Sequence, residues 1–226
     1  MISIIIPTYN EQEHILKLVH GLGNHQAIEI IIVDGGSTDG TLQLLQAIPH
    51  LIVYNAPIKG RAAQLNYGAS KAKHNILYFV HADVLVHDNY YNHITTAMEQ
   101  GVQLGCYRYT FDSTSKLLKW NGYMTRYNGI WAGGGDQSLF TTKATFNKLN
   151  GYNDELLIME DFDLIQRAKK QNLKLTILPY SITVSARKYV HNSWLRVQLA
   201  NAVMVVAWRL GAPQHWLVSV YKKMLR

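Results

Sequence analysis

The chain has 226 residues with 48% hydrophobic and 16% charged side chains, an ordinary globular balance that excludes a disordered protein. Its one cysteine, Cys106, excludes an intramolecular disulfide and a zinc site built on cysteines, and we expect a buried thiol there. The net charge of +7 at pH 7 suits anionic partners such as phosphates or an acidic membrane surface, but no dense basic run indicates a nucleic-acid partner.

The first half of the chain alternates short apolar runs with helical patterns. The runs have the length and near-continuous apolarity of buried parallel strands: Ile2–Ile6, Ile28–Val33, Leu51–Tyr54 and Ile76–Val80. Apolar residues at helical spacing lie between them over three segments: 15–22, 42–48 and 65–72. We expect Asn10 to cap the first helix and Ser37 or Thr38 to cap the second. This repetition predicts an α/β fold with a mostly parallel central sheet flanked by helices.

The second half is less regular, and no repeat or linker divides it from the first. Two strands and two helices are predicted there: Leu104–Phe111, Ser138–Thr141, Leu117–Met124 and Glu160–Lys170. Two more strands, Leu173–Leu178 and Ile182–Ser185, precede a helical tail from Trp194 to Arg226 that is interrupted around residues 211–213. We therefore expect a single domain over residues 1–226. No secretory signal or run of about 20 apolar residues is visible, so we expect a cytoplasmic protein.

Charged, polar and glycine residues follow each of the four apolar runs of the first half. They occupy four segments: residues 7–11, 34–40, 59–61 and 81–83. In an open α/β sheet the carboxyl ends of the strands form one rim, and ligands bind outside that rim. A fold needs turns at these places, but it does not need acids and bases at each of them. The sequence therefore predicts a ligand site along this rim.

Three of these segments have a definite chemistry beside a plainer structural alternative. Asp34 precedes two glycines and suits hydrogen bonds to a nucleobase or ribose, and its alternative is a turn with a helix cap. Lys59 and Arg61 suit a diphosphate, or form a solvated basic turn. Asp83 follows a buried strand and suits Mg²⁺ or Mn²⁺ bridging two phosphate oxygens, whereas His81 is either a ligand or a packed histidine.

Two segments of the second half carry further candidates. Glu160 and Asp161 stand where a helix begins, and the helix dipole stabilises carboxylates at that position. The functional alternative is a general base that takes the proton from an acceptor hydroxyl. The glycine cluster at 133–135, before Asp136 and Gln137, is no dinucleotide fingerprint and is better interpreted as the wall of a substrate pocket.

Together these motifs resemble the inverting family 2 glycosyltransferases, which have the GT-A fold of nucleotide-diphospho-sugar transferases. The resemblance covers roughly residues 1–190, and each motif alone is weak. It is carried by Pro-Thr-Tyr-Asn-Glu at 7–11, Val-Asp-Gly-Gly-Ser-Thr-Asp-Gly at 33–40, His-Ala-Asp at 81–83, Gly-Gly-Asp-Gln at 134–137 and Met-Glu-Asp at 159–161.

The resemblance implies a role for each matched position. Eight residues would bind the nucleotide: Pro7, Thr8, Tyr9, Glu11, Asp34, Lys59, Arg61 and Ala82. Asp83 would hold the cofactor, Mn²⁺ or Mg²⁺, and His191 is a hypothetical further metal ligand. Asp161 would be the catalytic base, with Glu160 shaping the acceptor site. Three residues would lie near the sugar or acceptor: Gly134, Asp136 and Gln137.

The details are most similar to a bacterial subgroup named radical-SAM/selenodomain-associated transferase 2. In that subgroup Gly-Arg-Ala, His-Ala-Asp and Ser-Ala-Arg recur, as they do here at 60–62, 81–83 and 185–187. The name of the subgroup states no substrate. His81 departs from the family motif, which has an acid at this position. A metal role for Asp83 survives that change, while a contact from position 81 to ribose or sugar is in doubt.

The resemblance thus implies a metal-dependent transferase that moves a sugar from a nucleoside-diphosphate sugar, UDP- or GDP-linked by family habit, to an acceptor hydroxyl with inversion. We expect residues 1–100 to bind the donor, residues 101–190 to supply the acceptor site and base, and residues 191–226 to form a helical C-terminal segment. A nucleotidyltransferase and a binding module without turnover stay open as alternatives. The first is expected to begin with a glycine-rich basic loop, which this chain lacks.

The C-terminal segment combines apolar and basic residues. Among them are Trp194, Leu195, Val203, Val206, Trp208, Leu210, Arg196, Arg209, Lys222, Lys223 and Arg226. Such helices can lie on an anionic membrane, cover the sheet or form a homodimer contact. A lipid-linked acceptor fits the membrane alternative, and the acceptor and the oligomeric state stay open.

Overall fold

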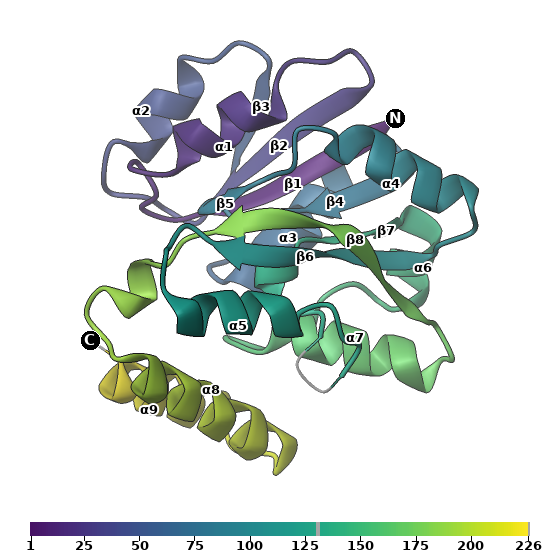
Figure 1. Cartoon of the computed structure of the whole chain (residues 1–226). Helices are drawn as coiled ribbons and strands as arrows, with labels where there is room; N and C mark the ends of the chain where they lie inside the picture. The colour runs from purple at the N-terminus through teal and green to yellow at the C-terminus, as the bar shows by residue number, and fades with distance from the viewer. Residues whose placement is uncertain (130–131, 226) are drawn as a thin grey trace.

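The computed structural model describes residues 1–129 and 132–225, and within them helices surround one eight-stranded sheet (Figure 1). The strand order is β3-β2-β1-β4-β7-β6-β8-β5. The first nine elements are β1 (Ile2–Thr8), α1 (Ile15–Leu22), β2 (Ile28–Asp34), α2 (Thr41–Gln46), β3 (Leu51–Asn55), α3 (Arg61–Lys71), β4 (Ile76–Phe79), β5 (Val84–Leu85) and α4 (Tyr90–Glu99).

The second half adds three strands, the remaining α-helices and two 3₁₀ turns. They are β6 (Leu104–Phe111), α5 (Lys116–Met124), η1 (Gly135–Gln137), β7 (Leu139–Thr142), α6 (Lys143–Lys148), α7 (Glu160–Lys170), β8 (Leu175–Val184), η2 (Arg187–Tyr189), α8 (Trp194–Arg209) and α9 (Gln214–Met224). The strand predicted over 104–111 and the helix predicted over 160–170 are confirmed with these bounds.

The sheet is mostly parallel, as the sequence predicts. Strands β3, β2, β1 and β4 run parallel to one another, and β6 runs parallel to β8. Strand β7 is antiparallel to both of its neighbours, and the short β5 is antiparallel to β8 at the edge. The α/β fold with flanking helices is therefore confirmed, and the carboxyl ends of β1, β2 and β4 lie side by side.

Both faces of the sheet are covered because successive residues of a strand point to opposite faces. On β1, Ile2, Ile4 and Ile6 pack with buried residues of α1, α2 and α4. Ile5 points the other way and packs with residues of α3, α6 and α7. Cys106 of β6 is buried in the second cluster, as predicted.

One prediction about the strands is wrong. The two strands predicted at 173–178 and 182–185 are a single strand, β8, which continues through Pro179. A proline lacks the backbone N–H that a sheet needs, so a break was expected there. The pairing with β6 instead shifts register between Cys106 and Arg108 and continues beyond it.

Besides the two 3₁₀ turns, one strand and two α-helices were not predicted from the sequence: β5, α4 and α6. Helix α4 does carry the helical signal, because Tyr90, Ile94 and Ala97 are buried at positions i, i+4 and i+7. Helix α6 begins at a side-chain cap, since the Thr142 hydroxyl accepts a hydrogen bond from the Thr145 N–H at 3.1 Å. The two residues of β5 are too few for any periodicity to show.

Helices α8 and α9 pack against each other at the periphery of the molecule, next to the C-terminus (Figure 1). The predicted interruption is confirmed, because Gly211 takes a left-handed φ of 80° between the two helices. Arg226, the end of the predicted tail, lies outside the described residues. Over residues 1–129 and 132–225, no helix has the length and apolarity to cross a bilayer.

Candidate functional site at the carboxyl ends of the strands

The loops after β1 and β2 are joined by hydrogen bonds. The Asn10 side-chain carbonyl accepts from the Thr38 N–H at 2.8 Å, and the Ser37 hydroxyl accepts from the Asn10 N–H at 2.9 Å. The Gln12 side-chain carbonyl accepts from the Gly40 N–H at 2.9 Å. Two predicted ligand segments, 7–11 and 34–40, therefore form one connected rim.

These bonds overturn the predicted helix caps. Asn10 has a left-handed φ of 54° and bonds across to the second loop, while α1 begins after His14 with no side-chain cap. Ser37 and Thr38 likewise bond to Asn10 and do not cap α2. The Asp39 carboxylate instead accepts from the first backbone N–H of α2 at 2.9 Å. Contacts between the loops replaced the local capping that the sequence favours.

Asp34 is buried at the end of β2 and is held by its own loop. One carboxylate oxygen accepts from the N–H groups of Gly36 and Ser37, each at 2.8 Å, and the other accepts from the Ser37 hydroxyl. Gly36 has a φ of 92°, which favours glycine and lets its N–H point back at the carboxylate. A carboxylate has about four acceptor positions, so one remains for a further donor.

Gln64 on α3 ties the strand ends together, and no sequence motif pointed to it. Its side-chain amide donates to the Thr8 carbonyl at 2.9 Å and to the Val33 carbonyl at 2.7 Å. Gly35 packs against the same amide, where an added Cβ would lie 3.1 Å from the nitrogen. A buried glutamine between alanines and a leucine on one helix was the signal available in the sequence.

A charged cluster joins the first turn of α3 to the first turn of α7. Arg61 forms an ion pair with Glu160, and its guanidinium lies 3.8 Å from the Asp161 carboxylate. Glu160 is fully buried, whereas the Arg61 side chain is 42% exposed and faces the solvent side of the rim. Met159, with a left-handed φ of 71°, turns the chain so that both acids enter the helix here.

Asp161 lies beside Gly135 and His81 in an enclosed position. A Cβ on Gly135 would come within 2.5 Å of an Asp161 carboxylate oxygen and 2.1 Å of the His81 ring, so only glycine fits. Burial, followed by the negative charge of Glu160, raises the pKa of Asp161 above its usual range, although Arg61 opposes the rise. A carboxyl group with a raised pKa is a stronger base, as proton abstraction from a hydroxyl requires.

His81 stays uncharged at neutral pH. Its enclosed position, with Arg61 and Arg187 nearby, holds the pKa of His81 well below its usual value. The family motif has an acid at this position, so this chain replaces a negative charge with a neutral ring. The structure brings His81, Arg61, Asp161 and the glycine cluster together, although their sequence positions lie far apart.

A second charged cluster links three loops at the same rim. Arg187, in η2 after β8, pairs with both carboxylate oxygens of Glu11 at 2.9 Å and with the Asp83 carboxylate at 3.1 Å. Glu11 follows β1 and Asp83 follows β4, so the guanidinium gathers two predicted ligand residues. The Ser-Ala-Arg motif at 185–187 was noticed in the sequence, but no role was given to Arg187.

The other residues predicted to bind the nucleotide differ in how far they are exposed to solvent. Pro7, Thr8 and Ala82 are buried, and the Thr8 hydroxyl has no hydrogen-bond partner within the part of the chain that the structure describes. Tyr9 is 57% exposed and Lys59 is exposed. The exposed pair can meet a ligand directly, while the buried three shape the floor beneath it.

The residues predicted to lie near the sugar or acceptor also include exposed and buried ones. Asp136 is exposed, and Gly134 lies against the Phe162 ring. Gln137 is buried, and its amide accepts from the Gly133 N–H at 2.7 Å and donates to the Tyr107 carbonyl at 3.0 Å. Gln137 therefore holds the glycine cluster in place through bonds that occupy its own polar atoms.

The residues present fit a divalent cation that binds mainly through the ligand's phosphates. No group of three or more His, Cys, Asp or Glu side chains suited to a metal occurs in residues 1–129 and 132–225. Mg²⁺ is commonly held by one or two carboxylates together with substrate phosphates, and Glu11 and Asp83 supply two such carboxylates beside each other. His191 is exposed, and its role as a ligand stays a prediction.

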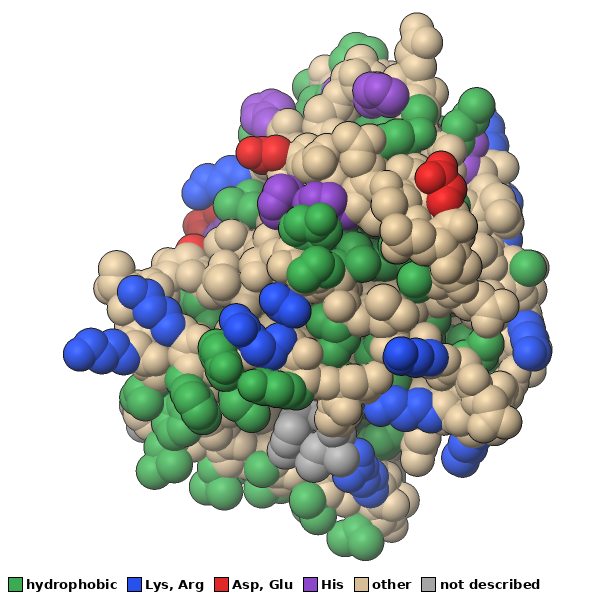
Figure 2. Space-filling model, turned by 45° about the vertical axis from the view of Figure 1, so that its right-hand side comes forward, with side chains coloured by type: hydrophobic (Ala, Val, Ile, Leu, Met, Phe, Trp, Pro, Cys, Tyr) green, Lys and Arg blue, Asp and Glu red, His purple; other side chains and the backbone are tan. Residues whose placement is uncertain are grey.

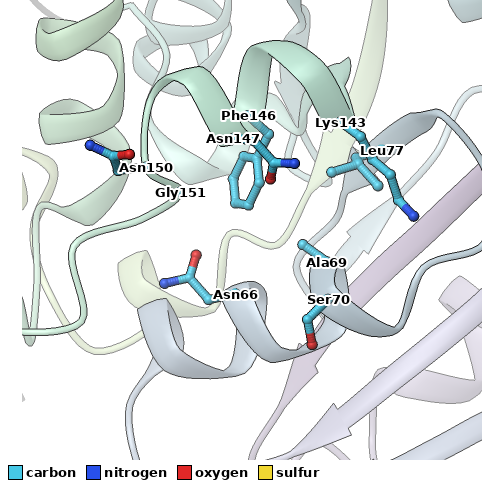
Figure 3. A pocket seen from close by; sticks show the side chains of 9 residues that line it. All are labelled: Asn66, Ala69, Ser70, Leu77, Lys143, Phe146, Asn147, Asn150 and Gly151. Atoms are coloured by element: carbon cyan, nitrogen blue, oxygen red, sulfur yellow. The ribbon is translucent and has the colours of Figure 1, made fainter.

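Two hollows flank this region. The smaller, of about 190 Å³, lies at the joined loops and includes Glu11, Asp39 and Arg187. The larger, of about 390 Å³, lies between α3 and α6, where Asn66 and Phe146 face each other (Figure 3). It contains none of the predicted site residues, so the charged clusters, and not the larger hollow, mark the candidate site.

Comparison with known proteins gives matches among glycosyltransferases. The chain is 34% identical over 96 residues to glycosyltransferase GlyG of Streptococcus pneumoniae serotype 4, covering 39% of this chain and 32% of GlyG. Its structure resembles S. aureus TarS 1-349 in complex with UDP-GlcNAc, with a TM-score of 0.69, 16% identity and coverage of 91% and 65% of the two chains. It also resembles the mannosyltransferase PcManGT from Pyrobaculum calidifontis in complex with GDP-Man and Mn²⁺, with a TM-score of 0.67, 18% identity and coverage of 97% and 64%.

The fold and the charged rim define the class of the protein. The mostly parallel sheet with flanking helices matches the GT-A-like fold of the glycosyltransferase structures. The chain belongs to glycosyl transferase family 2, whose family model matches residues 3–157. It spans about a third of the length of GlyG and less than two thirds of either solved chain.

Proposed function

We propose that the chain transfers a sugar from a nucleoside-diphosphate sugar to an acceptor hydroxyl. The observation that carries this proposal is the cluster of Arg61, Glu160 and Asp161 at the carboxyl edge of the sheet. It places a carboxylate with a raised pKa beside a cation that reaches solvent. The first group suits proton abstraction, and the second suits a leaving diphosphate.

The donor is a UDP- or GDP-linked sugar held by residues 1–100. Asp34 keeps one acceptor position free for a donor group of the base or ribose, and Tyr9 is exposed beside it. Lys59 and Arg61 offer cations to the diphosphate. The solved relatives bound to UDP-GlcNAc and to GDP-Man support a nucleoside-diphosphate donor without choosing between the two bases.

The cofactor is Mn²⁺ or Mg²⁺, held through Asp83 with Glu11 beside it. When bound, such a cation offsets negative charge on the departing nucleoside diphosphate. Arg187 now neutralises both carboxylates, so it is the group with which a metal competes. His191, from the loop that follows Arg187, is the further ligand in this proposal.

Transfer is a single displacement with inversion. Asp161 accepts the proton of the acceptor hydroxyl while the oxygen of that hydroxyl attacks the anomeric carbon. The bond from the anomeric carbon to the diphosphate oxygen breaks at the same time. Glu160 is fully buried, so it acts by positioning Arg61. Residues 101–190 supply the acceptor side of the site. Within them Asp136, exposed beside the glycine cluster, contacts the sugar or acceptor in this proposal.

The similarity of three motifs supports membership in the radical-SAM/selenodomain-associated transferase 2 subgroup. They include Arg61 in Gly-Arg-Ala, Asp83 in His-Ala-Asp and Arg187 in Ser-Ala-Arg; Arg187 pairs with Asp83, and Arg61 lies beside Asp161. The rival nucleotidyltransferase reaction would release pyrophosphate, whereas glycosyl transfer releases a nucleoside diphosphate. Identification of the phosphate product by chromatography separates the two reactions.

Thermal melting with nucleotides tests the donor site. We expect one of UDP, GDP, CDP, ADP or dTDP to raise the melting temperature in the presence of Mn²⁺ or Mg²⁺, because a ligand that binds the native state stabilises it. The rise should be smaller without metal and should weaken in Asp83→Asn. If no nucleotide with either metal shifts the transition, the proposed donor site is wrong.

Arg187 gives a separate test of the metal site. We expect Arg187→Ala to tighten Mn²⁺ binding to the free protein by about threefold to tenfold, because the cation no longer displaces a partly exposed guanidinium. Titration of Mn²⁺ followed by electron paramagnetic resonance, without donor, measures the change. Arg187→Lys, which keeps the charge, should show a smaller gain. Unchanged affinity in Arg187→Ala would place the metal elsewhere.

A further inference from the structure

The exposed apolar side chains are concentrated in two segments. Seventeen large apolar side chains are exposed among the described residues, and eleven of them lie in residues 117–127 and 190–216. We name these eleven the α5–α9 surface: Leu117, Trp120, Tyr123, Met124, Tyr127, Val190, Leu195, Leu199, Val206, Leu210 and Trp216. Single exposed apolar residues are normal, but a concentration of this kind marks an interaction site.

Helix α8 is apolar on two opposite faces. The face that packs inside the protein carries Val197, Ala200, Met204 and Val205. The exposed side carries Leu195, Leu199 and Val206, and Leu210 follows at the C-cap; the four fall within an arc of about 60° at 3.6 residues per turn. A helix that packs on one neighbour needs a single apolar stripe, so the exposed stripe is suited to a further contact.

Helix α5 continues this surface. The Trp194 indole N–H at the start of α8 donates to the Asn121 side chain at 3.2 Å, which joins the two helices. Trp120 stacks on Tyr123 at 5.9 Å, and the Arg126 guanidinium lies 3.8 Å above the Tyr123 ring. Exposed Trp and Tyr together with arginine are typical of the region between water and lipid.

The charged side chains of the C-terminal segment have one sign. Residues 164–226 contain eleven of the 22 Lys and Arg of the chain and none of its 15 Asp and Glu. Around the apolar stripes, Lys119, Arg209, Lys222 and Lys223 are exposed. On the face drawn in Figure 2, red acidic side chains lie in the upper part, while the lower part carries green and blue side chains.

We propose that the α5–α9 surface binds the surface of an anionic lipid bilayer. Apolar side chains flanked by basic ones combine insertion between headgroups with attraction to anionic lipid. Association of a second copy through this face would bring two basic, acid-free regions together, and like charges oppose that. The surface adjoins the site through η2, where Lys188 contacts the Tyr221 ring of α9 at 5.6 Å and Arg187 pairs with Asp83.

Vesicle flotation of the full chain tests the proposal without any measurement of transfer. We expect flotation with vesicles of phosphatidylcholine and phosphatidylglycerol in equal amounts, little flotation with phosphatidylcholine alone, and loss in high salt. Lys222→Glu/Lys223→Glu should lower the partition coefficient at least about tenfold, because each basic residue near an anionic surface contributes about fivefold. Lys17→Glu/Lys148→Glu changes the net charge equally, on exposed residues of α1 and α6, and should bind like the parent.

A second pair of variants separates the apolar contribution from the charge. Leu199→Asn should weaken binding to the anionic vesicles, whereas Ile58→Asn, at a similarly exposed residue outside the surface, should not. Thermal melting of each variant checks that it is folded. Absence of flotation by the folded parent would overturn the proposal, and so would equal losses in the two double-charge variants. If the parent is dimeric by light scattering and does not bind vesicles, and Leu199→Asn is monomeric, the surface contacts a second copy of the chain instead.

Discussion

Asp161→Asn is expected to lower kcat by about 10²–10⁴-fold while leaving donor affinity nearly unchanged. The amide keeps the size of the carboxyl group and removes its capacity to accept a proton. Donor contacts belong to the rim around Asp34 and Arg61, which the substitution does not remove. Initial-rate kinetics with a nucleotide–metal pair found by thermal melting, together with donor titration, measures both quantities.

The same variant should be at least as stable as the parent. The native pKa of Asp161 is raised above the unfolded value, so the stability linked to this group is present at low pH and is lost as pH rises through the native pKa. Asparagine has no such loss, so the stability advantage of Asp161→Asn should grow as pH rises from the unfolded pKa to the native pKa and level off above it. Urea unfolding at several pH values measures it, and a variant that is less stable at every pH would contradict this account.

The pH profile of the parent enzyme provides the matching control. Because Asp161 must be ionised to accept a proton, kcat should fall on the acid side at a pH above the usual aspartate range of about 4. Asp163→Asn, a change to a partly exposed carboxylate paired with Arg167 on the same helix, should leave that limb in place. An active Asp161→Asn enzyme with an unchanged acid limb would remove Asp161 from the role of base.

The sheet and much of the rim could be predicted from the sequence because their signals are local. A run such as Ile2–Ile6 is apolar at every position, and this indicates a strand buried on both faces. The rule that ligands gather at carboxyl ends then directs attention to Glu11, Asp34 and Asp83. The prediction of the helix cap at Asn10 was wrong because its side chain could bond either to the start of α1 or to the second loop. It accepts a hydrogen bond from the Thr38 N–H in the second loop.

The pairing of charges could not be predicted, since it depends on where distant loops meet. Arg187 lies 176 positions after Glu11, and Arg61 lies 99 positions before Glu160. Periodicity carries no information about which of several cations on a rim faces a given acid. Burial is equally hidden from the sequence: Glu160 and Asp161 are both buried, with side chains that are 0% and 9% exposed.

Arg61→Ala is expected to destabilise the protein by about 2–4 kcal/mol at neutral pH. Glu160 would be left fully buried without the guanidinium that pairs with it. Breaking a fully buried pair costs about 3–5 kcal/mol, and the 42% exposure of the Arg61 side chain lowers that figure. Urea unfolding at pH 7 measures the difference in the free energy of unfolding.

The double variant Arg61→Ala/Glu160→Gln separates the two roles of the arginine. A neutral amide at position 160 needs no counter-ion, so most of the lost stability should return, and the cycle should show coupling above about 1 kcal/mol. Turnover should not return, because the proposed diphosphate contact of Arg61 is absent in both variants. If the double variant regains the parental kcat, Arg61 is a counter-ion for Glu160 and does not contact the donor. If Arg61→Ala alone keeps the parental stability, Glu160 is neutralised by another group and the cluster has a different electrostatic balance.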